Sequence, residues 1–156
     1  MSDDLIAKKN GEVIEGHRIL SEIGRGAASI IYLAQDQKSK QIWALKHVQK
    51  RTDKDQRFLD QAEIECKVAQ ALDHPAIRKI PRMIKKGKLL RTTELFLVME
   101  LVDGMSMERH PPATFETAVD IFHQVARGMH HMHERGYVHA DMKPNNIVVS
   151  DNNRAK

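Results

Sequence analysis

The chain of 156 residues has the length of one domain, or of one small lobe joined to part of another. With 41% hydrophobic and 29% charged residues, its composition is that of a globular protein and excludes a disordered polar chain. The net charge of +4 comes with only 4% aromatic residues, so the basic stretches lack the stacking platforms that bind single-stranded nucleic acids. We therefore expect no nucleic-acid partner.

The N-terminal residues and the single cysteine bear on the compartment. Residues 1–11 change from acidic to basic without an apolar run, and we assign residues 1–16 to a polar leader. No stretch reaches the length of a membrane span. Cys66 has no second cysteine to pair with, and it falls on the apolar stripe of a predicted helix. These features predict a cytoplasmic chain without a membrane partner.

Three β-compatible runs follow the leader, at residues 17–23, 29–35 and 41–48. The glycine-containing segment 24–28 separates the first two runs, and a polar turn at residues 36–40 separates the second from the third. Short connections of this kind join neighbouring antiparallel strands. The sequence therefore predicts an antiparallel meander.

A helix and two further strands complete the first predicted lobe, over residues 17–100. Apolar residues three or four apart predict a helix from Thr52 to Leu72, which Asp73-His74-Pro75 ends. Residues 81–86 and 94–100 are predicted strands, and the second is continuously apolar, as in a strand buried on both faces. Five antiparallel strands and one helix predict an α+β fold.

After a break at Asp103-Gly104, a long helix is predicted from Thr114 to Arg135, with Gly136 as its C-terminal cap. Short apolar pieces at 137–139 and 147–150 flank a polar loop, and the turn after them predicts a returning strand near Arg154. Few residues remain to form that returning strand or to cover the apolar face of the helix. We therefore expect a further C-terminal part beyond the last residue.

The segment Gly24-Arg25-Gly26-Ala27-Ala28-Ser29-Ile30-Ile31 lies between two predicted strands. Glycines there satisfy the geometry of a tight turn, or they let backbone N–H groups approach nucleotide phosphates without obstruction. A dinucleotide-binding fold needs a helix directly after the glycines, and a Walker loop needs Gly-Lys-Ser/Thr. Neither pattern is present, so the turn and the phosphate-binding flap are the two interpretations.

Lys46 interrupts the apolar third strand within Trp43-Ala44-Leu45-Lys46. A lysine in a strand commonly extends its ammonium group to solvent. An ammonium group that stays partly buried needs an anionic partner instead. Glu65 on the following helix is the best candidate, and Glu63 is the alternative on a different face.

The segment His139-Ala140-Asp141-Met142-Lys143-Pro144-Asn145-Asn146 is the most specific of the chain. Its functional interpretation has Asp141 accepting a hydroxyl proton, Lys143 near a transferring phosphoryl group and Asn146 binding Mg²⁺. The alternative is a polar turn between short strands.

Taken together, the glycine segment, the strand lysine and this loop resemble the motif set of protein kinases, over residues 17–156. With a lysine two residues after Asp141, the loop resembles that of serine/threonine kinases rather than that of tyrosine kinases. The resemblance implies a protein-kinase-like fold with an N-lobe at residues 17–100, a hinge at 101–104 and a partial C-lobe at 105–156.

The resemblance also implies a nucleotide site for ATP and Mg²⁺ and a protein substrate with a Ser or Thr hydroxyl. Lys46 would bind the α- and β-phosphates, braced by Glu65, and the hinge backbone from Glu100 to Val102 would bind the adenine. The glycine loop would contribute Ile23, Gly24, Arg25, Gly26 and Ser29, and the adenine pocket Ile31, Ala44, Met99 and Val148. Asp141, Lys143 and Asn146 would be the catalytic residues, with Asn146 the metal ligand.

Three departures from the family pattern matter. Ser29 replaces the third glycine of the loop. Ala140 replaces the usual arginine before the catalytic aspartate, so control through a phosphorylated activation loop is not expected. The Asp-Phe-Gly segment, with another magnesium ligand, would fall beyond Lys156. Two hypotheses follow: a kinase segment completed elsewhere, for instance by a complementary C-lobe chain, or a non-catalytic module that binds nucleotide or a partner.

Overall fold

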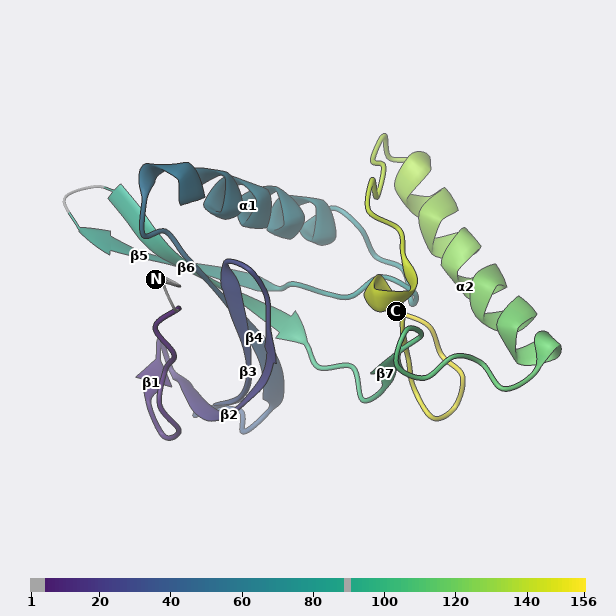
Figure 1. Cartoon of the computed structure of the whole chain (residues 1–156), viewed down its shortest axis with the longest axis horizontal. Helices are drawn as coiled ribbons and strands as arrows, with labels where there is room; N and C mark the ends of the chain where they lie inside the picture. The colour runs from purple at the N-terminus through teal and green to yellow at the C-terminus, as the bar shows by residue number, and fades with distance from the viewer. Residues whose placement is uncertain (1–4, 89–90) are drawn as a thin grey trace. The chain divides into compact units, whose positions relative to one another are not determined.

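A computed structural model describes residues 5–88 and 91–156, and these residues divide into two compact units (Figure 1). The first unit comprises Met1–Lys67 with Ile80–Leu101, and the second comprises Val68–Lys79 with Val102–Lys156. The chain therefore passes between the units at three places, one of them near the end of the first helix.

The first unit is built on an antiparallel sheet with the strand order β1-β2-β3-β4-β6-β5. Five of its strands were predicted from the sequence, with small differences at their ends. The sixth, β1, lies inside the polar leader and was not predicted, since two residues carry no periodicity. The strands are β1 Val13–Ile14, β2 His17–Arg25, β3 Ser29–Asp36, β4 Ile42–Gln49, β5 Arg82–Lys88 and β6 Arg91–Glu100.

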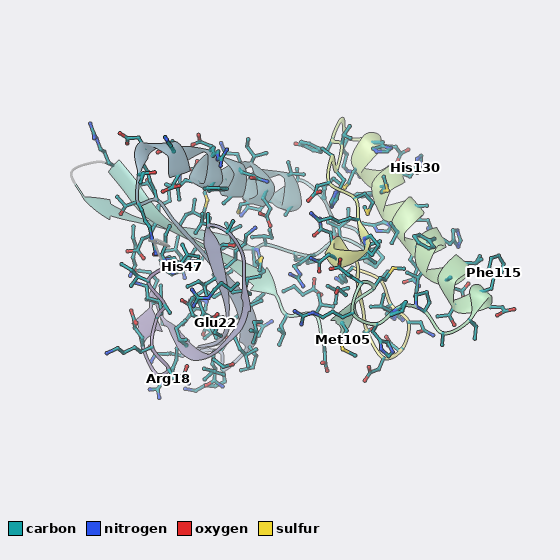
Figure 2. The ribbon with its side chains drawn as sticks, in the orientation of Figure 1. Arg18, Glu22, His47, Met105, Phe115 and His130 are labelled. Atoms are coloured by element: carbon teal, nitrogen blue, oxygen red, sulfur yellow. The ribbon has the colours of Figure 1, made fainter. Side chains whose placement is uncertain are left out.

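The sheet has two faces with different coverings, because side chains alternate along each strand. One face carries a buried apolar cluster that includes Tyr32, Leu45, Phe96 and Val98. His47, labelled in Figure 2, is buried on this same face. Its ring stacks on Phe96 with the centroids 4.2 Å apart. The chain before β1 covers this face.

Helix α1 (Gln56–Gln70) packs on the opposite face. The predicted helix from Thr52 begins instead with a 3₁₀ turn at Asp53–Asp55, which the Thr52 N–H stabilises by donating to Asp55 Oδ2 at 2.8 Å. Cys66 lies on the buried side of α1, with its Sγ 3.9 Å from the Ile80 carbonyl oxygen. Its burial agrees with the apolar stripe that the sequence predicts.

The second unit contains helix α2 (Phe115–His133) and a small two-stranded sheet. The Thr117 N–H donates to the Thr114 hydroxyl at the N-terminus, and Gly136, with φ at +78°, follows the C-terminus as predicted. Strands β7 (Met105–Ser106) and β8 (Val148–Val149) pair antiparallel. No helix in the described residues is long and apolar enough to cross a membrane.

The last residues of the chain pack against the rest of the second unit. The returning strand predicted near Arg154 is reduced to one β-bridge, between Val149 and Ala155, and residues 137–139 form no strand. Ala155 joins the small apolar core with Met107, Ile121 and Ile147. The final residues are thus part of the packing.

The loop between α1 and β5 packs on α2. The Asp73 N–H donates to His131 Nε2 at 3.3 Å, and the rings of His74 and His131 lie 5.3 Å apart between centroids. A Cβ at Gly128 would stand 3.3 Å from the Ala76 Cβ, so glycine permits this close approach.

Candidate functional site

Strand β4 and helix α1 bring the predicted lysine and glutamate together. Lys46 Nζ lies 2.6 Å from Glu65 Oε2, and the two side chains are 24% and 39% exposed. Leu45 and His47 turn to the buried face of the sheet, so Lys46 between them turns to the face that α1 covers. Glu63, the alternative partner, instead pairs with Lys85 of β5 at 2.7 Å.

The glycine segment closes as a hairpin turn next to this pair. The Gly26 N–H donates to the Ser29 carbonyl at 2.8 Å, and Gly24 lies opposite Ile31 in the β2–β3 register. Ile31 in turn lies opposite Lys46 in the β3–β4 register. The sheet therefore places the glycine turn, Ile31 and Lys46 in one row across three strands.

Arg25, between the two glycines, forms an ion pair that sequence reasoning missed. Its Nε and Nη2 donate to the two carboxylate oxygens of Glu22 at 2.9 and 2.8 Å. These hydrogen bonds lower the pKa of Glu22 below its ordinary value. Opposite charges three residues apart were the available signal, which a regular strand would have placed on opposite faces. A register shift between Glu22 and Gly24 brings them together.

The residues expected around the adenine fall into both units. Ala44 and Met99 lie opposite each other in the β4–β6 register, and both are buried, whereas Ile23 is exposed. Glu100 ends β6 in the first unit. Val102 and Val148 belong to the second unit. A common adenine pocket formed by these residues stays a prediction.

In the second unit, three side chains of the predicted catalytic loop meet at one carboxylate. Lys143 Nζ lies 3.1 Å from Asp141 Oδ2, and Asn146 Nδ2 donates to the same oxygen at 3.1 Å. Asn146 Nδ2 also donates to the Asp141 carbonyl at 2.8 Å, from within a 3₁₀ turn at Pro144–Asn146. Hydrogen bonds from Lys143 and Asn146 lower the pKa of Asp141, so its side chain is a carboxylate at neutral pH.

The backbone before Asp141 is unusual. Ala140 has φ at +57°, in the left-handed region that L-residues other than asparagine and aspartate seldom occupy. The Asp141 N–H donates to the His139 carbonyl at 2.8 Å, which makes a tight turn around Ala140. Strained backbone of this kind concentrates at functional loops.

Few side chains are suited to hold a metal ion. Residues 5–88 and 91–156 contain no group of three or more His, Cys, Asp or Glu side chains in a metal-binding arrangement. The Asn146 amide nitrogen is used on Asp141, which leaves the amide oxygen as a ligand of the kind that Mg²⁺ accepts. These residues fit a Mg²⁺ ion that is held mainly by substrate phosphates.

Comparison with known proteins decides the family. Residues 17–156 match the protein kinase domain. The chain belongs to the protein kinase family. Its kinase relatives include the serine/threonine-protein kinase PknJ of Mycobacterium tuberculosis, 31% identical over 143 residues, and cyclin-dependent kinase 4 of Xenopus laevis, 32% identical over 144 residues. The alignments cover 90% and 88% of this chain, which is thus of the serine/threonine kinase type.

Solved structures show the same kinase fold. The PknI kinase domain of M. tuberculosis superposes with a TM-score of 0.75 at 25% identity, over 96% of this chain and 59% of that one. The kinase chain spans 23% of PknJ and 45% of cyclin-dependent kinase 4. It therefore represents part of the length of its relatives, and it carries both the lysine–glutamate pair and the catalytic-loop cluster.

Proposed function

We propose that this chain forms the ATP-binding and catalytic-loop part of a serine/threonine protein kinase, which transfers the γ-phosphate of ATP to a protein hydroxyl. The observation that carries the proposal is the convergence of Lys143 and Asn146 on the Asp141 carboxylate, each at 3.1 Å. In protein kinases the catalytic-loop aspartate accepts the proton of the substrate hydroxyl and the loop asparagine binds Mg²⁺, and the cluster around Asp141 supports these roles here.

Nucleotide binding falls to the first unit in this proposal. Lys46, held by Glu65, is the cation for the α- and β-phosphates, and the glycine turn brings its backbone close to the phosphate oxygens. Ala44 and Met99 offer an apolar surface to the adenine ring. Mg²⁺, when bound with ATP, neutralises charge on the phosphates, and Asn146 is its ligand from this chain.

The catalytic loop supplies the chemistry at the acceptor. Asp141, ionised at neutral pH, accepts a hydrogen bond from the substrate hydroxyl, orients its oxygen and takes its proton as transfer proceeds. Lys143 stabilises the charge on the transferred group. Asn146 holds the loop through its bond to the Asp141 carbonyl. Because Ala140 stands where the family has arginine, this loop lacks the side chain that would bind a phosphorylated activation loop.

A second candidate function is a module that binds nucleotide or a partner kinase without turnover. It is favoured by the metal chemistry, since Asn146 is the single magnesium ligand that the proposal assigns to this chain. In the kinase proposal, the Asp-Phe-Gly segment comes from further sequence or from a complementary chain. Both candidates are placed in the cytoplasm, where a lone buried thiol such as Cys66 stays reduced.

Nucleotide binding is tested by the shift in melting temperature on adding MgATP. We expect a shift for the wild-type chain and a much smaller one for Lys46→Met. Lys85→Met is the matched control, since it breaks the other lysine–glutamate pair to α1 and leaves the proposed site intact. An equal shift in wild type and Lys46→Met would remove Lys46 from the site.

Phosphotransfer is tested with γ-labelled ATP and a mixture of Ser- and Thr-containing peptides, on the chain supplied with the Asp-Phe-Gly segment that the kinase proposal requires. Asp141→Asn is expected to abolish transfer while it preserves the MgATP-dependent melting shift. Retained turnover in this variant would refute the role of Asp141. Nucleotide binding without transfer, even with the Asp-Phe-Gly segment supplied, would favour the non-catalytic module.

A further inference from the structure

The segment Leu5–Lys9, within the predicted polar leader, is bound to the sheet through its backbone. The Ile6 N–H donates to Gln49 Oε1 at 3.1 Å, and Gln49 Nε2 donates back to the Ile6 carbonyl at 2.8 Å. Two residues on, the Lys8 N–H donates to the Tyr32 hydroxyl at 2.8 Å. Gln49 and Tyr32 therefore grip an extended backbone at alternate residues, as a neighbouring strand would.

The side chains beneath the segment are buried polar groups that it helps to satisfy. Gln49 is 5% exposed and His47 is 1% exposed. His47 Nε2 lies 2.7 Å from Glu94 Oε2, and the same oxygen lies 3.3 Å from Lys8 Nζ. Lys8 Nζ also lies 6.0 Å from the centre of the Phe96 ring, within the range of a cation–π contact. Undocking the segment would leave the Gln49 amide and the Glu94 carboxylate without these partners.

Strand β4 links this network to the candidate nucleotide site. His47 and Gln49 face the segment, whereas Lys46, the residue before His47, faces α1 and pairs with Glu65. A change in the backbone twist of β4 that turns one of these side chains also turns its neighbour on the other face. The partners of Gln49 and His47 thus bear on the direction in which Lys46 points.

We propose that Leu5–Lys9 is a latch in cis, docked through Gln49 and Lys8, that holds β4 in the twist which directs Lys46 to Glu65. Gln49 is then a positioning residue for the nucleotide site. The expected effect on nucleotide binding rests on the proposed function. The expected effect on β4 rests only on the contacts of the segment. Leu5 packs against the buried apolar cluster of this face, and Lys8 Nζ lies 3.3 Å from Glu94 Oε2, so the segment contributes one apolar and one charged contact.

The test uses the full chain and measures amide hydrogen exchange together with the affinity for a fluorescent ATP analogue. In Gln49→Met and in Lys8→Met, the amides of Ile6 and Lys8 should exchange roughly tenfold faster, because about one net hydrogen bond or ion pair is lost. The amide of Lys46 should also exchange faster, and analogue affinity should fall about threefold or more. Lys8→Arg keeps a cation beside Glu94, so its exchange rates and its analogue affinity should equal those of wild type.

Lys9→Met is the matched control, since it removes one positive charge from the same segment without touching Glu94, and it should behave as wild type. Ile121→Val, in the core of the second unit, controls for general destabilisation and should leave analogue affinity unchanged. Should Gln49→Met fail to fold, the comparison of Lys8→Met with Lys8→Arg decides the question.

Three results would overturn the latch. Unchanged exchange at Ile6 and Lys8 would show that Gln49 and Lys8 do not hold the segment. Faster exchange at Ile6 and Lys8, with Lys46 exchange and analogue affinity unchanged, would show that the segment covers the sheet without positioning Lys46. Protection of Ile6 that rises with protein concentration, together with dimers in light scattering, would place the segment on a second copy. A wild-type chain that binds no nucleotide refutes the proposed function instead. The latch is then tested by the exchange rate of the Lys46 amide alone.

Discussion

Lys46 of β4 and Glu65 of α1 meet at 2.6 Å although 19 residues separate them in the chain. The contact ties the helix to the sheet at the residue proposed to bind phosphate. Glu63, two residues earlier, pairs with Lys85, so lysines from two different strands form ion pairs with α1. The position of the helix and the direction of Lys46 therefore depend on each other.

Glu65→Gln should separate positioning from stability. Both side chains of the pair are partly exposed, so the free energy of unfolding should change by less than about 1 kcal/mol. Nucleotide affinity should fall about tenfold, because a charged hydrogen bond that orients Lys46 is lost. Titration with an ATP analogue and urea denaturation measure the two quantities. Glu63→Gln is the control, and an equal loss of affinity in that variant would contradict a specific role for Glu65.

Stability should fall as the pH is lowered from 7 to 5 because of His47. Burial lowers the pKa of His47 from 6.5 to about 4, despite the attraction of Glu94. Burial opposes ionisation of Glu94, but His47 and Lys8 hold its pKa below the ordinary value. Between pH 6.5 and 4 the unfolded chain binds more protons than the folded chain, so stability present above pH 6.5 is lost on acidification. The loss should be about 2 kcal/mol by pH 5.

Urea denaturation at pH 7 and pH 5 measures this loss, and His47→Gln should reduce it. Burial also lowers the pKa of His74, with further repulsion from His131, Arg127 and Lys156, so part of the dependence should remain. If the free energy of unfolding changed equally between pH 7 and pH 5 in wild type and in His47→Gln, His47 would not govern stability in this range.

Ala140 should respond to substitution in the opposite way to a helical alanine. Its φ of +57° is strained for any residue with a Cβ, so Ala140→Gly should leave stability unchanged or raise it by up to about 1 kcal/mol. Ala140→Val should lower stability by more than about 1 kcal/mol, since β-branching is least tolerated there. Thermal denaturation checks both. Ala126→Gly, on an exposed position of α2, should cost about 1 kcal/mol and provides the contrast.

Gly104→Ala should disturb the small sheet of the second unit. A Cβ at this position would stand 2.3 Å from the Val149 carbonyl oxygen, so β8 would have to move. The expected cost is about 1–3 kcal/mol in the free energy of unfolding. Gly136→Ala has open space around its Cβ and only the strain of its positive φ, so it should cost about 1 kcal/mol. Equal costs for the two variants would contradict the close approach to Val149.

The elements that could be predicted are those with enough residues to carry a pattern. Helix α2 shows its apolar spacing over five turns and is bounded by Thr114 and Gly136, and both ends were found. Strand β1 could not be found, because Val13 and Ile14 join the sheet through a turn at Glu15 and Gly16, both with positive φ. No local propensity identifies such a turn when one of its residues is glutamate.

The candidate site divides in the same way. The cluster around Asp141 is local in sequence, and its residue types at their spacing were enough to single it out. Glu65 was favoured over Glu63 as the partner of Lys46, and the ion pair is present. The contacts of Gln49 with Ile6 span 43 residues and join a polar side chain to backbone atoms, which leave no trace in a hydrophobic pattern. The roles of these residues toward ATP stay predictions.

Cys66 gives the first unit a built-in reporter of its own opening. The side chain is 1% exposed, and burial, together with the nearby Glu65 charge, raises the pKa of its thiol. Only the thiolate form of a cysteine attacks a disulfide reagent, so the native chain protects Cys66 both by covering it and by keeping it protonated. The rate at which Cys66 reacts with such a reagent would therefore report how often α1 separates from the sheet.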